Sequence, residues 1–144
     1  INTQEIFMQM PEISGIESQI AAKKAEVTKA LEAIEAERNA KYKEFQDAAS
    51  AQEGQASETI LLDKQKQLQQ IQERLETFHQ NSMTEVQTLQ QKLVEPVNQK
   101  LQKAIKEVGD EQGYAYILDV NATPYIGSTA VDASPLVKAK LGIK

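Results

Sequence analysis

Few residues in this 144-residue sequence are of the types that carry out chemistry at active sites. His79 is the single histidine, and no second ligand type lies at a spacing that would complete a metal site or a catalytic pair. Cysteine is absent, which excludes thiol catalysis, zinc-thiolate sites and disulfides. Glu32, Glu35 and Asp119 have acidic neighbours, but carboxylates on an exposed helix are usually solvated. The sequence therefore predicts no catalytic residue, no cofactor and no metal site, and we expect a protein that is not an enzyme.

Short binding motifs and charge patterns point the same way. There is no glycine-rich phosphate loop, and Asp119-x-Asn121 lacks the rest of a calcium loop. The formal net charge of -5 provides no basic field, so we expect no nucleic-acid partner. The longest aliphatic run, Ile60-Leu61-Leu62, is far shorter than the ~20 apolar residues that a membrane-spanning helix needs. These observations leave interaction proteins as the main class.

The positions of glycine and proline define two long helix-compatible segments. Residues 16–53 and 55–95 contain neither residue type, so we expect two long helices with one break between them. At the break, Gly54 can close the first helix and Ser57 can cap the second. The first helix is predicted to begin at Pro11, a good first-turn residue, or at Ser14, which opens a capping box.

Apolar residues recur at helical spacing along both segments, which predicts a helical hairpin with a narrow seam. The first stripe contains Ile16, Ile20, Val27, Leu31, Ile34, Tyr42, Phe45 and Ala49. The second contains Leu61, Leu68, Ile71, Leu75, Phe78, Val86, Leu89, Leu93, Val97, Leu101, Ile105 and Val108. The second helix should continue through Pro96 with a bend and end between Gly109 and Gly113.

The C-terminal region has a different pattern. Residues 114–120 alternate aromatic or branched side chains as a strand does, and residues 123–127 predict a second short strand. Ser134-Pro135 is typical of the start of a short helix with Leu136, Val137 and Leu141 on its apolar side. Because two strands are marginal in water, such a sheet would have to borrow strands from an upstream segment or from sister subunits.

We therefore expect a mainly α protein with a small β body, an α+β fold in which a long antiparallel helical hairpin projects from a β-rich oligomerisation body. The predicted body comprises residues 1–10 and 109–144, with the short C-terminal helix. The predicted arm comprises residues 11–108, with its tip near residues 50–58. The chain begins at Ile1 without a methionine, so we expect a signal peptide to have been removed.

Several stretches near the two ends of the chain form a recognisable combination. They are Asn2–Phe7, Met10–Glu12, Ala104–Val108, Gly113–Asp119, Tyr125 and Asp132–Val137. This combination resembles the Skp/OmpH family of periplasmic chaperones. The resemblance implies a homotrimer whose body holds three helical-hairpin arms around a cavity. It also implies an ATP-independent holdase that binds unfolded outer-membrane β-barrel proteins in the periplasm and prevents their aggregation.

The resemblance and the apolar residues together nominate two sets of site residues. Many weak apolar contacts spread over the arms could retain an unfolded client reversibly. The predicted client-binding residues are Tyr42, Phe45, Ile60, Leu61, Leu62, Phe78 and Met83. The predicted trimerisation residues are Ile1, Tyr114, Tyr116, Ile117, Leu118, Val120, Tyr125 and Val137.

The charge of the predicted tip departs from that of the best-known members of the family. Those members are strongly basic, whereas residues 47–63 carry four acidic residues and no lysine or arginine. This argues against contact of the tip with anionic lipid or lipopolysaccharide.

The alternative function is a structural coiled-coil scaffold or tether that binds no client.

Overall fold

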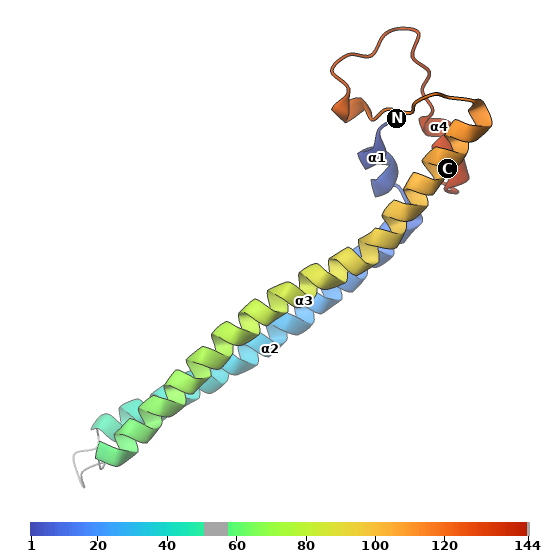
Figure 1. Ribbon diagram of the computed structural model, residues 1–144. Coiled ribbons are helices and arrows are strands. Elements are labelled where there is room, and N and C mark those ends of the chain that lie inside the picture. The colour runs from blue at the N-terminus through green and yellow to red at the C-terminus, as the bar shows by residue number, and fades with distance from the viewer. Residues whose placement is uncertain (51–57, 144) are drawn as a thin grey trace. The chain divides into compact units, whose positions relative to one another are not determined.

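The computed structural model describes residues 1–50 and 58–143. Its elements are α1 (Thr3–Met8), α2 (Pro11–Ser50), α3 (Glu58–Gln112), the 3₁₀ helix η1 (Val120–Ala122) and α4 (Ser134–Lys140) (Figure 1). Residues 51–57, which hold most of the predicted tip with its Gly54 and Ser57 caps, lie outside the described residues.

The expected β body is wrong, because the described part of the chain contains no strand and the fold is all-α. Residues 114–120 and 123–127 were predicted as strands, but residues 114–119 and 123–127 are irregular and Val120 begins η1. Their one strand-like pairing is with Ile1, whose ammonium donates to the Leu118 carbonyl at 2.9 Å and whose carbonyl accepts from Val120 N–H at 2.8 Å. A strand persists only when a neighbour pairs with a run of its backbone groups, and a single residue cannot provide that ladder.

The structure confirms the two long helices as α2 and α3. They form because glycine and proline are the residues that interrupt helices. Of the two predicted starts of the first helix, the structure uses Pro11, and Ser14 lies inside α2. The second helix continues through Pro96 as predicted. It stops where Gly113 adopts φ +68°, and Tyr114 N–H then donates to the Gly109 carbonyl at 3.0 Å, which closes a Schellman motif.

The chain forms two compact units, which we describe separately. The terminal unit consists of Ile1–Ile20 and the chain from Leu89 onward, and the hairpin unit consists of Ala21–Thr88. The predicted division into a trimerisation body and an arm concerns the assembled protein and stays a prediction.

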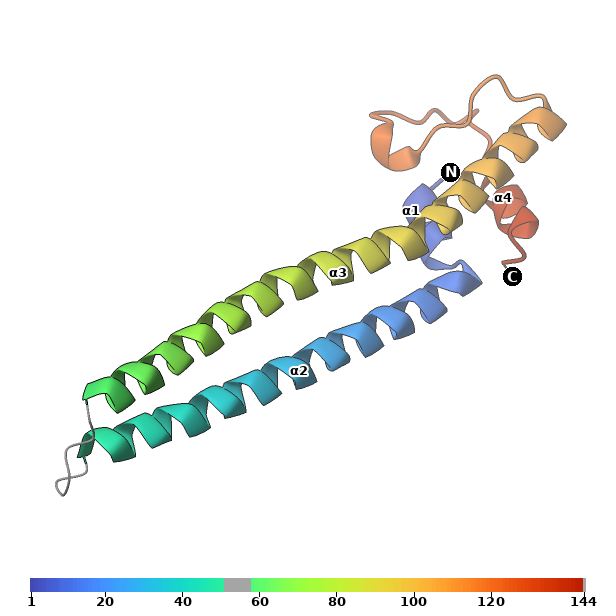
Figure 2. The same ribbon diagram turned by 60° about the horizontal axis from the view of Figure 1, so that its bottom comes forward.

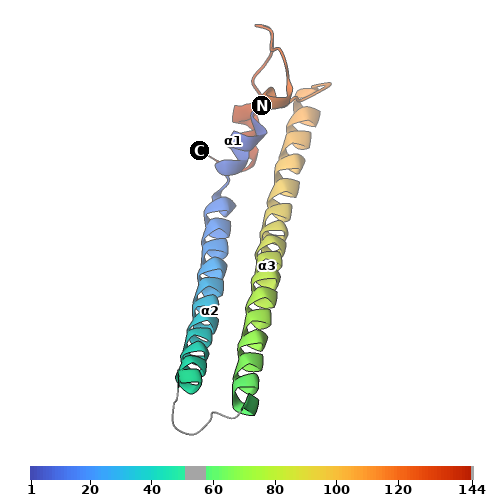
Figure 3. The same cartoon turned by 90° about the vertical axis from the view of Figure 1, so that its left-hand side faces the viewer.

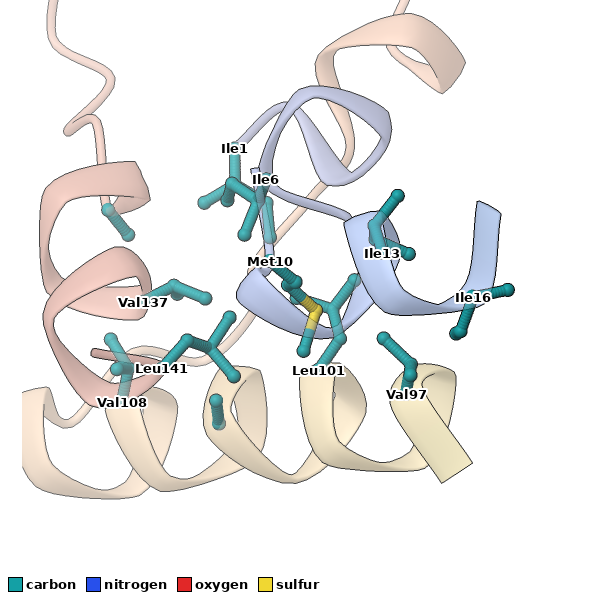
Figure 4. Close-up of a cluster of buried hydrophobic side chains, with 12 residues drawn as sticks. Ile1, Ile6, Met10, Ile13, Ile16, Val97, Leu101, Val108, Val137 and Leu141 are labelled. Atoms are coloured by element: carbon teal, nitrogen blue, oxygen red, sulfur yellow. The ribbon is translucent and has the colours of Figure 1, made fainter. Parts of the chain in front are cut away.

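The core of the terminal unit lies where α1, the start of α2, the end of α3 and α4 meet (Figure 4). Ile6, Met10, Val108 and Val137 are its most deeply buried large side chains. Burying such side chains is the main favourable term in folding. The other buried members are Ile1, Ile13, Ile16, Val97, Leu101, Ala104, Ala133 and Leu141.

Ion pairs on the surface of the terminal unit link the same helices. Lys138 of α4 contacts Glu5 of α1 at 2.8 Å, and Lys140 of α4 pairs with Glu111 of α3. Lys100 of α3 pairs with Glu12 of α2. Each helix that contributes to the core is therefore also connected to a neighbour by charge.

In the hairpin unit, α2 and α3 run side by side in opposite directions (Figures 2 and 3). The seam between them is thinly packed. Ile71 is the one buried apolar side chain among the described residues of this unit, and Ser82 is buried beside the seam's half-buried residues. The half-buried positions of α2 include Lys23, Arg38 and Lys41. Ion pairs add to this apolar seam at Lys23–Glu85 (3.1 Å), Lys64–Glu44 (3.4 Å) and Arg74–Glu37.

Candidate functional site

A cavity of about 560 Å³ opens in the terminal unit among the irregular residues that follow α3. It is lined mainly by aromatic and branched side chains, with Asn2, Glu5 and Asp132 among its polar members. Of the predicted trimerisation residues, the lining includes Ile1, Tyr114, Tyr116, Ile117, Leu118, Val120 and Tyr125. The structure thus brings most of that set together without a sheet.

The predicted trimerisation residues differ in their access to a partner. Tyr116 and Tyr125 are 84% and 82% exposed, and Leu118 and Val120 are also exposed. Tyr114 and Ile117 are partly buried against the core, whereas Ile1 and Val137 are buried within it. A second chain could contact the four exposed side chains directly, but the other four contribute to the core of their own chain.

A polar network fixes the segment that carries these side chains. The Thr3 hydroxyl donates to the Asp119 carboxylate, which also accepts from Asn121 N–H at 2.7 Å. The Asn2 side-chain oxygen accepts from Glu5 N–H at 3.0 Å and from the Asn121 side-chain amide at 3.2 Å. Asx-type hydrogen bonds of this kind stabilise irregular backbone. Asp119 therefore holds η1 against the start of α1.

The two carboxylates beside the cavity are held in their charged forms. The hydrogen bond from Lys138 lowers the pKa of Glu5. Hydrogen bonds from Ser134, including its backbone N–H at 2.9 Å, lower the pKa of Asp132. A general acid near neutral pH needs a raised carboxylate pKa, so neither group is suited to that role. The surface is instead suited to apolar contact with a polar rim.

The predicted client-binding residues separate into two groups in the hairpin unit. Tyr42, Leu62 and Met83 are 52%, 59% and 55% exposed, and Ile60 is exposed to a similar degree. Phe45, Leu61 and Phe78 are half-buried in the seam between α2 and α3. Tyr42 was predicted to lie in the first apolar stripe, but Lys41 takes the seam position in its place. A long lysine side chain can bury its methylene stem while its ammonium stays in water.

His79 lies in a groove of about 260 Å³ on the hairpin unit. Leu31 and Leu75 line this groove, with Glu35, Glu76 and Gln80 among the remaining lining residues. Across residues 1–50 and 58–143, no three histidine or carboxylate side chains are grouped so that they could hold a metal ion. Within the same ranges, no helix is long and apolar enough to cross a membrane.

Sequence reasoning missed some features of the terminal unit. Helix α1 was not predicted, although Asn2 is a good N-cap residue and its side chain accepts from Glu5 N–H. Ile126 and Val131 line the cavity and are exposed but were not nominated. Their branched side chains in a stretch of mostly small and polar residues were the signal that could have identified them.

Comparison with known protein families gives one match. The family described as outer membrane protein (OmpH-like) matches residues 1–141. No curated protein and no solved structure matches the chain. The family match includes both units and every terminal stretch that carries the Skp/OmpH resemblance. The protein therefore belongs to the OmpH-like family, a family of chaperones for outer-membrane proteins.

Proposed function

We propose that this protein is an ATP-independent holdase of the periplasm that binds unfolded outer-membrane β-barrel proteins and prevents their aggregation. The observation that carries this proposal is the family match over residues 1–141. The hairpin unit supports it, because its exposed Tyr42, Leu62 and Met83 are separated by polar residues. Scattered apolar side chains can contact a client weakly without forming a patch that causes self-association.

The proposed active form is a homotrimer assembled through the terminal unit. Tyr116, Tyr125 and Leu118 lie exposed around one cavity, and large exposed aromatic groups are typical of residues that become buried at interfaces. A trimer would place three hairpin units around one client, and several weak contacts would then act together. Client release needs no ATP in this scheme, because each contact breaks independently.

The decisive experiment dilutes a urea-unfolded outer-membrane barrel protein into buffer and follows light scattering as the protein is added. Suppression that saturates near one trimer per client is expected. Native mass is measured on the same sample, so that assembly and activity are read together. A confirmed trimer that leaves scattering unchanged would contradict the holdase and favour the coiled-coil scaffold. A mass other than a trimer would contradict the proposed assembly.

A further inference from the structure

The two broad faces of the hairpin unit differ in chemistry, and the difference follows from the register of its seam. Seam positions are the buried and half-buried residues of α2 and α3 in the hairpin unit. In an antiparallel helix pair, the residues that directly follow seam positions on both helices lie on the same face. Those that directly precede seam positions lie on the opposite face. The 260 Å³ groove confirms this geometry, because Glu35 follows the seam residue Ile34 and Glu76 follows the seam residue Leu75.

The face made by the residues that directly precede seam positions carries the ion pairs between the helices, and we call it the ion-paired face. Glu37, Glu44 and Glu85 each directly precede a seam residue. They pair across the seam with Arg74, Lys64 and Lys23 respectively. These charged groups are paired and exposed to water. An apolar client that covered this face would have to remove that water, which costs free energy.

The face made by the following residues is rich in amides on α3. We define the glutamine face as the exposed α3 residues that follow the seam, namely Leu62, Gln65, Gln69, Gln72, Glu76, His79, Met83 and Gln87. Glu76 is its only carboxylate. Tyr42 of α2 follows the seam residue Lys41, so it lies on the same side of the pair and is also exposed.

Glutamine side chains can hydrogen-bond to the backbone of an extended client segment whatever the sequence of that segment. A glutamine amide both donates and accepts, so it can bond to backbone N–H or C=O groups in either register, and it carries no charge to desolvate. The Gln69 and Gln72 amides donate to Glu73 and Glu76 at 3.1 and 2.9 Å, which leaves their carbonyl oxygens able to accept. Met83 and Leu62 add apolar contact, and methionine adapts to many shapes.

We propose that the glutamine face, and not the ion-paired face, is the surface that contacts an unfolded outer-membrane strand. This inference rests on the proposed holdase function and assigns the side of the hairpin that performs it. The glutamine face has Glu76 as its one carboxylate, whereas α2 contributes Lys24, Glu32 and Glu35 to the same side of the pair. The segment that matches the glutamine face is therefore an extended strand of alternating apolar and polar residues that lies along α3. A second copy of the hairpin is a poorer fit, because helix pairing needs apolar residues on every turn and this face has only polar or charged residues between Leu62 and Met83.

A photocrosslinking experiment tests the assignment with matched positions. A benzophenone amino acid is placed in turn at Gln72 and Met83 on the glutamine face, and at Gln70 and Asn81, which are exposed and precede seam residues. Each full-length variant is irradiated with a urea-unfolded outer-membrane barrel protein as probe. We expect client crosslinks several-fold stronger from Gln72 and Met83 than from Gln70 and Asn81.

The other outcomes separate this inference from the holdase proposal. Equal client crosslinks from the two faces, with aggregation still suppressed, would overturn the face assignment alone. Crosslinks from Gln72 to a second copy of the chain that client does not displace would also overturn it. No client crosslink from any position, together with no suppression of scattering, would overturn the proposed function itself.

A second pair of variants gives a quantitative check. The double change Gln72→Glu with Met83→Glu places carboxylates on the glutamine face and should weaken client affinity about tenfold. The matched change Gln70→Glu with Asn81→Glu adds the same charge to the opposite face and should leave affinity within about twofold. Circular dichroism verifies that both variants remain helical. Equal losses of affinity would contradict the assignment.

Discussion

Side chains that are fully shielded from water occur mainly in the terminal unit, and Ile6 of α1 is one of them. Ile6→Ala removes buried carbon and leaves a cavity, so it should lower the free energy of unfolding by about 2–5 kcal/mol. Met8 lies on the same short helix but is exposed, so Met8→Ala should change it by less than about 0.5 kcal/mol. Urea unfolding monitored by circular dichroism measures both. Comparable losses would show that α1 does not pack as described.

Two glycines with open space around their Cα atoms should respond to alanine with opposite signs. Gly113 adopts φ +68°, a conformation in which a Cβ is strained, so Gly113→Ala should cost about 1 kcal/mol of stability. Gly15 is inside α2, where alanine has the higher helix propensity, so Gly15→Ala should stabilise the protein by about 0.5–1 kcal/mol. Thermal unfolding of the two variants gives the comparison, and a shared sign would contradict the Gly113 geometry.

The exposure of single residues was harder to predict than their pattern. Tyr42 fitted the helical spacing of the seam, yet the aliphatic stem of Lys41 occupies that position. Ile1 and Val137 were expected at a subunit interface, but they lie in the core of their own chain. Spacing identifies which residues share a stripe, whereas burial depends on which segments from distant parts of the chain pack against it.

At the scale of elements, the two long helices and the short C-terminal helix α4 could be predicted, whereas α1 and the irregular residues between α3 and α4 could not. The distribution of glycine and proline determines where α2 begins and where α3 ends, because these residues act through local backbone conformation. The expected strands depend on partners that sequence patterns do not supply, and residues 114–119 remain irregular. The candidate surface was found partly by residue type: Tyr116 and Tyr125 were nominated, whereas Ile126 and Val131 were not.

The ion pairs that connect the terminal helices predict sensitivity to acid. The hydrogen bond from Lys138 lowers the pKa of Glu5, and that from Lys100 lowers the pKa of Glu12, below the ordinary value of 4.5. A carboxylate whose pKa is lowered on folding binds fewer protons in the native state. Its contribution to stability is therefore present above pH 4.5 and is lost as the pH falls through the lowered pKa.

Thermal midpoints measured at several pH values test this expectation. The midpoint of the wild type should fall on acidification below the ordinary glutamate pKa. Lys138→Met removes the partner of Glu5, so the variant should start from a lower midpoint and lose less on acidification. Parallel pH curves for the two proteins would show that the Glu5–Lys138 pair contributes nothing to the folded state.

At the scale of the whole molecule, the proposed trimer can be tested at residues that the single chain does not need. Tyr116→Asp with Leu118→Asp places two carboxylates on exposed positions of the terminal unit, so the chain should remain folded while assembly is lost. Multi-angle light scattering should show about three times the chain mass of 16.0 kDa for the wild type and a single chain for the variant. Ile117 is unsuitable for this test because it packs against the chain's own core.

Retention of the trimer mass by that double variant would contradict assembly through the cavity surface. Helicity measured by circular dichroism is the control, because a loss of helix would show that the substitutions had unfolded the chain. The single change Val131→Asp offers a milder test at an exposed side chain that lines the same cavity, and it should raise the concentration at which the trimer dissociates.

The core of the terminal unit is built from both ends of the sequence, and this has a consequence for the order of folding. During synthesis, Ile6 and Met10 emerge long before Val137 and Leu141, so this core cannot close until α4 has been made. The hairpin unit lies between them and pairs residues that are closer in sequence. Because nearby contacts form sooner than distant ones, the helices of that unit should pair before the N-terminal residues acquire their partners. A chain truncated before α4 should therefore be cut readily by proteases near α1 while its hairpin resists them.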